Sequence, residues 1–264
     1  MTAFRILRWG SDELPPAVCL HDVRGHARRF ERVARMLERG RLVVAYDLRG
    51  HGRSPWSGPH TIDQHADDLH EVLDACGIDQ AGLIGDGFGA RVAIAYAVRN
   101  QERINSLTLL EPPLAPSPEA MREAARVERD GGGYAGVDEA IDRRRQEDGL
   151  LHTPRGLLEE EMAEHLVADD DGCYRYRYSR EAAAAALEAT AHPETRLADV
   201  LCPTMLIHGH ESRWLTDGDV EAAFDAVRRL RVEEVPGGHV VLWDAMAETS
   251  ALVRDFLVAK DRTA

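Results

Sequence analysis

The amino-acid sequence predicts an α/β protein with a mostly parallel, doubly wound β-sheet and an inserted helical cap. Short apolar runs, typical of buried strands, alternate with helical segments in residues 1–111 and 198–264, which we assign to the core. Residues 112–197 lie between these two segments and are polar and rich in helix formers, which predicts the cap. A glycine-rich turn follows the apolar run at 81–86 and predicts a tight junction between a strand and a helix.

The composition indicates a soluble globular chain and argues against several classes of partner. Of the 264 residues, 44% are hydrophobic and 30% are charged, and the net charge is −14. Nucleic acids and anionic membranes bind basic surfaces, so neither is expected as a partner. The N-terminus has no apolar leader segment and no run approaches the roughly 20 apolar residues of a membrane span, so we expect a cytoplasmic protein. No C-x-x-C spacing occurs, and free thiols are expected at Cys19, Cys76, Cys173 and Cys202.

Three strands and two helices are expected before the glycine-rich turn. Residues 4–9 alternate like an edge strand, whereas residues 17–21 and 42–46 are continuous apolar runs typical of buried strands. Residues 27–38 predict a helix, and residues 61–76 predict a second one with its apolar side chains on one face. This half of the chain therefore has the strand and helix alternation of a parallel sheet.

Three histidines lie in or next to the second of these helices. His60, His65 and His70 recur every five residues, which is not the i, i+4 spacing of a helical metal site. We therefore expect solvated histidines there, with no metal ion and no cofactor.

After the turn, the chain completes the core around the cap. Residues 103–110 predict another strand, and the two prolines that follow Glu111 stop it and begin the cap. Good helix formers indicate cap helices at 159–167 and 180–190. The core then resumes with elements expected as strands at 203–209 and 231–235 and as helices at 217–230 and 244–258.

The glycine-rich turn has glycine at Gly85, Gly87 and Gly89. This stretch resembles the nucleophile elbow of the α/β-hydrolase fold, in which G-x-S-x-G places a nucleophile on a sharp turn between strand and helix. Residues 47–54 are also similar to a D-x-R-G-x-G-x-S signature of that superfamily, where we expect His51 to serve packing. In this alignment Gly87 occupies the nucleophile position. The resemblance thus implies the hydrolase scaffold without its usual serine.

Asp86 is the alternative nucleophile, since haloalkane dehalogenases and epoxide hydrolases of this fold use aspartate. In that alignment the bulky Phe88 would stand where the turn requires glycine, and Gly89 would lose its packing role. The poorer fit favours Asp86 as a polar residue that lines the pocket.

The resemblance also implies an oxyanion hole made by the backbone N–H groups of Val23 and Phe88. Family members usually have His-Gly before the first of these donors, but here Asp22 replaces the glycine. A carboxylate beside the hole would repel a developing anion unless it points away or is protonated. We expect Asp22 and Asp86 to lie near one another at the pocket mouth, where their repulsion would raise the pKa of one of them.

The resemblance places His239 in the position of the catalytic base, at the exit of the last strand. Two carboxylates compete for the role of its orienting partner. Glu111 lies 24 residues after Gly87, a location that some haloalkane dehalogenases use, whereas Glu211 lies one residue before the usual acid position at Ser212. Either carboxylate would orient the imidazole and stabilise its cation.

Three functional hypotheses follow. The favoured one is an enzyme that acts on a small or medium carbonyl-containing substrate, with His239 as general base and no serine nucleophile, by hydrolysis or by enolate chemistry of the lyase or cyclase type. The second is a non-catalytic pseudo-hydrolase that binds a ligand or partner. The third is an esterase inactivated by replacement of serine with glycine, or an Asp86-dependent dehalogenase or epoxide hydrolase. For partners we expect a small-molecule substrate, with a homodimer as an option.

Overall fold

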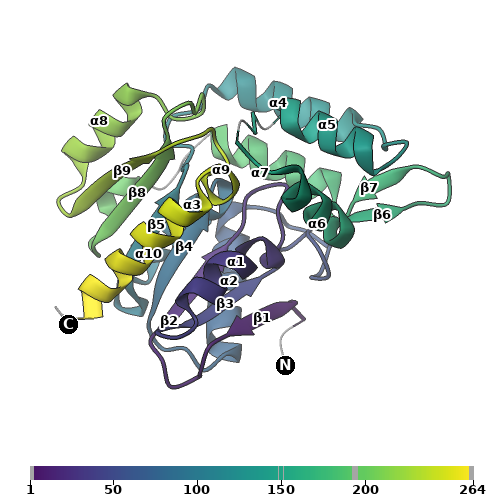
Figure 1. The fold of residues 1–264 in the computed structure, drawn as a ribbon. Helices are drawn as coiled ribbons and strands as arrows, with labels where there is room; N and C mark the ends of the chain where they lie inside the picture. The colour runs from purple at the N-terminus through teal and green to yellow at the C-terminus, as the bar shows by residue number, and fades with distance from the viewer. Residues whose placement is uncertain (1–2, 148, 151, 192–195, 262–264) are drawn as a thin grey trace.

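A mostly parallel β-sheet forms the centre of the molecule (Figure 1). The computed structural model describes residues 3–147, 149–150, 152–191 and 196–261, and within these residues the sheet has seven strands in the order β1-β3-β2-β4-β5-β8-β9. Strand β1 runs antiparallel to β3, and the other neighbouring strands are parallel. The strands are β1 Ile6–Trp9, β2 Pro16–Leu20, β3 Leu42–Tyr46, β4 Ala81–Asp86, β5 Ile104–Leu110, β8 Thr204–Gly209 and β9 Leu230–Val235.

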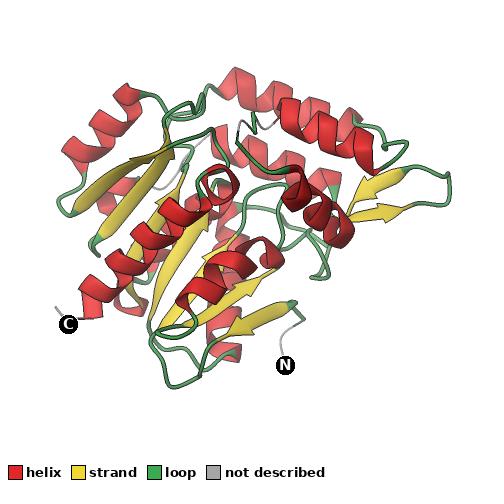
Figure 2. Ribbon diagram, viewed as in Figure 1, coloured by secondary structure: helices red, strands yellow, loops and turns green. Residues whose placement is uncertain are grey.

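Helices cover both faces of this sheet, which confirms the predicted fold class (Figure 2). Helix α1 packs against α10, whereas α2 packs against α3. None of the helices in the described part of the chain combines the length and apolar composition needed to cross a membrane. The core helices and 3-10 turns are η1 Ala27–Phe30, α1 Glu31–Leu37, α2 Ile62–Ala75, α3 Phe88–Arg99, η2 Gln101–Arg103, η3 Leu197–Asp199, α8 Asp217–Ala226, α9 Val241–Asp244 and α10 Met246–Asp261.

The segment between β5 and β8 forms helices and a small hairpin beside the carboxyl ends of the central strands (Figure 1). It is joined to the loop after β3 by two backbone hydrogen bonds, from Gly52 N–H to Arg177 O and from Ser179 N–H to Gly50 O. Its elements are α4 Pro118–Asp130, α5 Val137–Glu147, α6 Arg155–His165, β6 Leu166–Ala168, β7 Tyr174–Tyr176 and α7 Arg180–Ala191. We call residues 112–197 the cap segment.

Three predicted helix boundaries are wrong, two because the sheet or a hairpin takes the terminal residues and one because the helix is interrupted. The helix expected to reach Leu230 ends at Ala226, since Leu230 pairs with Thr204 in the sheet. The cap helix expected to continue to residue 167 ends at His165, since the next residues form the β6–β7 hairpin. The closing helix α10 is preceded by the separate short helix α9, and Ala245 between them has a non-helical backbone conformation (φ −132°, ψ 47°).

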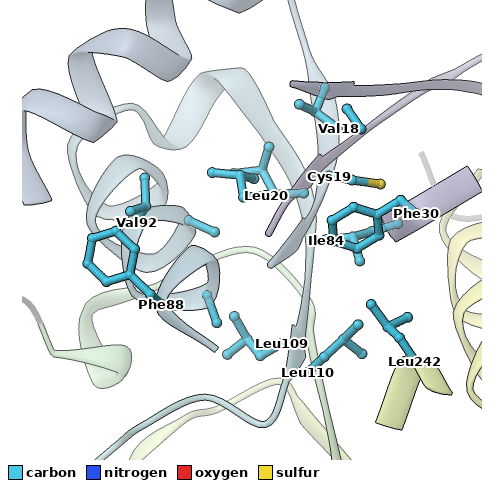
Figure 3. Packing of buried hydrophobic residues seen from close by; sticks show 14 of the residues in the cluster. Val18, Cys19, Leu20, Phe30, Ile84, Phe88, Val92, Leu109, Leu110 and Leu242 are labelled. Carbon is cyan, nitrogen blue, oxygen red and sulfur yellow. The ribbon is translucent and has the colours of Figure 1, made fainter. Parts of the chain in front are cut away.

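Apolar packing fixes the carboxyl ends of β2 and β4, and the residues of the candidate site follow these ends. Leu20 of β2 is fully buried, and Phe30 and Phe88 pack from opposite sides of these strands (Figure 3). Leu20 is paired with Gly85 in the register of β2 and β4. Asp22 and Gly87 each follow these paired positions by two residues, so the register brings them together at one edge of the sheet.

Candidate active site

The turn after β4 has the conformation of a nucleophile elbow. Gly87 has φ 51° and ψ −114° and stands directly before helix α3. A side chain at either neighbouring glycine would collide with backbone, since an added Cβ at Gly85 would lie 2.5 Å from Ala90 Cα and one at Gly89 would lie 2.2 Å from Leu20 O. The glycines therefore let β4, α3 and β2 approach closely, as the sequence pattern predicted.

The Asp22 carboxylate fills the space that a side chain at residue 87 would need. An added Cβ at Gly87 would lie only 2.1 Å from Asp22 Oδ1. The same Oδ1 accepts the N–H of Phe88 at 2.7 Å. Asp22 thus occupies the expected oxyanion hole, and residue 87 can only be glycine while it does so.

Asp22 is held in this place as an anion. Burial alone would raise its pKa, but His239 and the backbone N–H groups of Phe88 and Val23 lower the pKa well below its usual range. The two N–H groups are the donors expected for the oxyanion hole. The hole therefore binds a carboxylate of the protein itself.

His239 lies between two carboxylates. Its Nδ1 is 3.2 Å from Glu111 Oε2, and its Nε2 is 3.8 Å from Asp22 Oδ2, which is an ion-pair distance rather than a hydrogen bond. Burial alone would lower the pKa of His239, but Asp22 and Glu111 outweigh this effect and raise the pKa to about 10. At neutral pH His239 is therefore an imidazolium cation in the resting state.

Glu111, and not Glu211, is the carboxylate that contacts His239. Glu111 is buried at the end of β5 in an unusual positive-φ conformation (φ 47°). It accepts hydrogen bonds from Gly209 N–H at 2.6 Å and from the Ser212 hydroxyl at 2.7 Å. Ser212, which stands at the usual acid position, thus donates a hydrogen bond to Glu111, and Glu111 is the carboxylate that contacts His239.

Glu211 lies in the neighbouring loop and serves that loop. It accepts the N–H of Gly237 at 2.6 Å, and its other oxygen is 3.6 Å from His152. The structure therefore does not bring Glu211 together with the imidazole of His239.

Asp86 is buried under the site and does not lie at a pocket mouth, which corrects that expectation. Its Oδ2 is 3.8 Å from the Arg29 guanidinium, which also contacts Glu161 at 3.2 Å and stacks on Trp243. Burial, and then the charge of Asp22, raise the pKa of Asp86 to about 7. Repulsion from Asp22 thus acts on Asp86 in the expected direction, although Asp86 is enclosed.

Three buried histidines contact residues of the site or of the loops next to it, and sequence reasoning gave them no place in the site. His21 Nε2 accepts the N–H of Leu48 at 2.9 Å, and His51 donates to Val23 O at 2.6 Å, which supports a packing role for His51. His65 stacks edge-on against Phe88 and is buried, so the prediction of a solvated histidine is wrong there. Burial lowers the pKa of all three, that of His65 to about 3, so they are neutral.

Solvent reaches the candidate site at Asp22 and His239. Their side chains are 21% and 17% exposed, whereas that of Glu111 is fully buried. Trp214 stands beside the imidazole, with the ring centres 5.7 Å apart. In the described part of the chain, no group of three or more His, Cys, Asp or Glu side chains is arranged to hold a metal ion.

Two cavities, each of about 560 Å³, lie away from these residues. One lies between α1 and α6 and is lined by paired Arg and Glu side chains, and the other lies beside β7 and Trp56. Neither is lined by Asp22, Gly87 or His239.

Comparison with known proteins identifies the family of this chain. The profile of the alpha/beta hydrolase fold family matches residues 16–245, so the chain belongs to this family. Lipase LipV of Mycobacterium tuberculosis is 31% identical over 189 residues, which cover 66% of this chain and 66% of the lipase. The 2-hydroxymuconate semialdehyde hydrolase of Pseudomonas sp. strain CF600 is 40% identical over 76 residues, which cover 28% of this chain and 27% of that hydrolase. The matches thus span less than two thirds of the length of these curated relatives.

Solved structures share the fold over nearly the whole chain. An E-2-(acetamidomethylene)succinate hydrolase superposes with a TM-score of 0.85 at 19% identity, covering 96% of this chain and 94% of that one. The enol-lactonase from Burkholderia xenovorans LB400 superposes with a TM-score of 0.80 at 20% identity, covering 97% and 96%. At this identity the likeness shows the fold alone.

The raised pKa of Asp86 gives a stability prediction. A carboxyl whose folded-state pKa of about 7 exceeds its unfolded value contributes stability that is lost as the pH rises from about 4 to 7. We expect Asp86→Asn to increase the free energy of unfolding at pH 8 by roughly 1–3 kcal/mol and to have little effect at pH 4. Urea unfolding at the two pH values measures this, with exposed Asp225→Asn as the control. A variant that is less stable than the wild type at pH 8 would contradict the prediction.

Proposed function

We propose that this chain is a hydrolase that works without a serine nucleophile, with His239 as its acid–base group and Glu111 as the orienting carboxylate. The observation that carries the proposal is the 3.2 Å contact from His239 Nδ1 to buried Glu111, in a site where Gly87 has no side chain to acylate. Glu111 holds the imidazole so that Nε2 faces the space beside Asp22. Such a carboxylate both orients a catalytic histidine and stabilises its cation.

His239 changes its role with the charge of Asp22. In the resting state the pKa of about 10 makes His239 a proton donor. When the negative charge of Asp22 is masked or displaced, the strongest cause of the raised pKa is removed and the imidazole can release its proton. It then acts as the general base that activates water.

The names of the relatives support a small or medium carbonyl-containing substrate, as the sequence suggested. A substrate carbonyl oxygen would need the N–H of Phe88, which Asp22 accepts in this structure. Hydrolysis of such a substrate therefore requires the Asp22 carboxylate to leave the hole when the substrate binds.

A non-catalytic binder is the second candidate, and one observation favours it. The Asp22 and Glu111 carboxylates both pair with His239, as in a structural ion-pair network. Simple inactivation of an esterase fits less well. A serine at position 87 would overlap Asp22 Oδ1, so replacing Gly87 alone does not restore an ordinary serine site.

Substitution of His239 distinguishes the proposed enzyme from a non-catalytic binder. We expect His239→Gln to lower the hydrolysis of a reactive probe by about 10²–10⁴-fold, the usual contribution of a general acid–base group. The probes are p-nitrophenyl acetate and phenyl glycidyl ether, assayed in parallel. Equal rates for the wild type and His239→Gln with both probes would favour the binder.

We also expect a serine-directed fluorophosphonate to leave the wild type unlabelled and active, because Gly87 offers no hydroxyl to phosphonylate. Intact-protein mass measures the labelling. Rapid stoichiometric labelling with loss of activity would contradict hydrolysis without serine.

A further inference from the structure

We propose that Asp22, on the loop after β2, is the nucleophile of this enzyme, and that its substrate is an epoxide or a similarly strained cyclic ether. The inference rests on the proposed function, because His239 must still activate the water that completes the reaction. It assigns a catalytic residue outside the elbow and replaces the carbonyl-containing substrate with an epoxide, while the roles of His239 and Glu111 stay as proposed.

The position of the carboxylate carries the inference. Asp22 Oδ1 accepts the Phe88 N–H at 2.7 Å, at the point where a side chain of residue 87 would begin. Its other oxygen, Oδ2, faces His239, and the side chain keeps 21% of its surface exposed. Oδ1 is therefore fixed in the oxyanion hole, while Oδ2 faces His239, the proposed acid–base group.

The hole stabilises charge on Asp22 itself. If Oδ2 forms an ester, Oδ1 becomes the carbonyl oxygen of that ester and already contacts the Phe88 N–H. Water that attacks Cγ of this ester places the new negative charge on Oδ1, which is where an oxyanion donor is effective. The geometry thus fits hydrolysis of an Asp22 ester better than hydrolysis of a substrate ester.

The occupied hole also restricts the electrophile. Attack on a substrate carbonyl would create an oxyanion that has no access to the Phe88 donor while Oδ1 holds it. Attack on a saturated carbon creates no such oxyanion, since the negative charge leaves with the departing atom. A saturated electrophilic carbon is therefore the substrate centre that suits Asp22.

The cation at His239 selects an oxygen leaving group. An opening epoxide ring releases an alkoxide that needs a proton, and His239 Nε2, which can supply it, lies 3.8 Å from the attacking oxygen Asp22 Oδ2. A departing halide needs no proton, so it would make no use of this imidazolium. The charged His239 consequently favours epoxides over alkyl halides.

The two steps balance in atoms and protons. Asp22 Oδ2 forms a bond to an epoxide carbon, the carbon–oxygen bond of the ring breaks, and His239 protonates the released oxygen. Water then gives one proton to His239 and attacks Cγ of the ester. The bond between Cγ and the ester oxygen breaks, and the second proton of the water passes to the leaving alkoxide. The products are a vicinal diol, the Asp22 carboxylate and the His239 cation.

Charge compensation links the two steps. The Asp22 and Glu111 carboxylates together raise the pKa of His239. Ester formation neutralises Asp22 and leaves only Glu111, so the pKa of His239 falls once it has given up its proton. The imidazole becomes a base at the stage at which water must be activated.

Oxygen isotope transfer tests the inference without a variant. The wild-type protein, in excess over phenyl glycidyl ether, is allowed one turnover in H₂¹⁸O. We expect the diol to contain no ¹⁸O, because its new oxygen comes from Asp22, and we expect ¹⁸O in the tryptic peptide of residues 9–24. Fragment ions distinguish Asp22 from Asp12 and Glu13 in that peptide.

Two variants sharpen the result. Asp22→Asn keeps the shape of the side chain and is expected to lower epoxide turnover at least ~10³-fold. Asp86→Asn is expected to keep the ¹⁸O transfer to Asp22, which excludes the neighbouring carboxylate as nucleophile. Circular dichroism verifies that each variant is folded.

Each contrary outcome is distinct. A diol that takes ¹⁸O directly from water, with Asp22 unlabelled, overturns the role of Asp22 but leaves His239-dependent hydrolysis in place. His239-dependent hydrolysis of p-nitrophenyl acetate with no epoxide turnover also overturns the role of Asp22 and leaves the proposed hydrolase in place. No His239-dependent turnover of either probe overturns both proposals.

Discussion

The double substitution Asp22→Gly with Gly87→Ser is expected to create a serine esterase. Removal of Asp22 vacates the space in which a Cβ at residue 87 would lie 2.1 Å from Oδ1, and it frees the Phe88 N–H for a substrate oxyanion. His239 then keeps Glu111 as its carboxylate partner, and its Nε2 can accept the proton of the new serine. We expect p-nitrophenyl acetate hydrolysis at least ~100-fold above the parent protein, since one oxyanion donor alone contributes about that factor.

The single variants provide the controls. Gly87→Ser alone should be inactive and destabilised, because the serine meets the Asp22 carboxylate and also adopts a positive φ that costs about 1–3 kcal/mol. Asp22→Gly alone should remain inactive as a serine esterase. Addition of His239→Gln should abolish the new activity. A folded double variant without His239-dependent hydrolysis would show that the elbow no longer positions a nucleophile for the imidazole.

The substitution Glu111→Gln is expected to lower catalysis by about 10³–10⁴-fold, comparable to loss of the carboxylate in a Ser-His-Asp triad. A neutral amide can still accept the Gly209 N–H but cannot stabilise the imidazolium of His239. Because Glu111 contributes to the raised pKa of His239, that pKa should also fall. The loss of catalysis is measured with whichever of p-nitrophenyl acetate and phenyl glycidyl ether the wild type hydrolyses faster. The pKa of His239 is measured by ¹⁵N NMR of its imidazole.

The pKa of His239 separates an orienting role for Glu111 from a merely structural one. A variant that loses activity through misfolding alone has no reason to show a native-like imidazole with a lower pKa. Glu211→Gln is the matched comparison, since Glu211 holds Gly237 and does not contact His239. A larger loss in Glu211→Gln than in Glu111→Gln would contradict the assignment of Glu111.

Local patterns were sufficient for most of the fold. Continuous apolar runs predict β3 and β4 because a strand covered by helices on both faces has no solvated side. The end of α8 was mispredicted, because Leu230 can extend a helix or pair with Thr204, and only the neighbouring strand decides between them. The burial of His65 was missed for a similar reason, since Phe88 comes from a different helix.

The site was only partly readable. The spacing of residues pointed to Gly87, His239 and the pair of candidates Glu111 and Glu211, because the family motif depends on chain order. The choice of Glu111 depends on its direction at the end of β5, where a positive φ and contacts with Gly209 and Ser212 aim the side chain at the imidazole. No local pattern encodes that direction.

The sequence by itself determined the sheet, the elbow and the absence of a nucleophile at Gly87, since each of these depends on neighbouring residues or on regular spacing. The tertiary structure alone decided that Asp22 fills the oxyanion hole. Asp22 and Gly87 are 65 residues apart in the chain, and they meet because the parallel register of β2 and β4 places Leu20 beside Gly85. The missing side chain of one residue is the space that the other occupies, and this complementarity exists only after the two strands have paired.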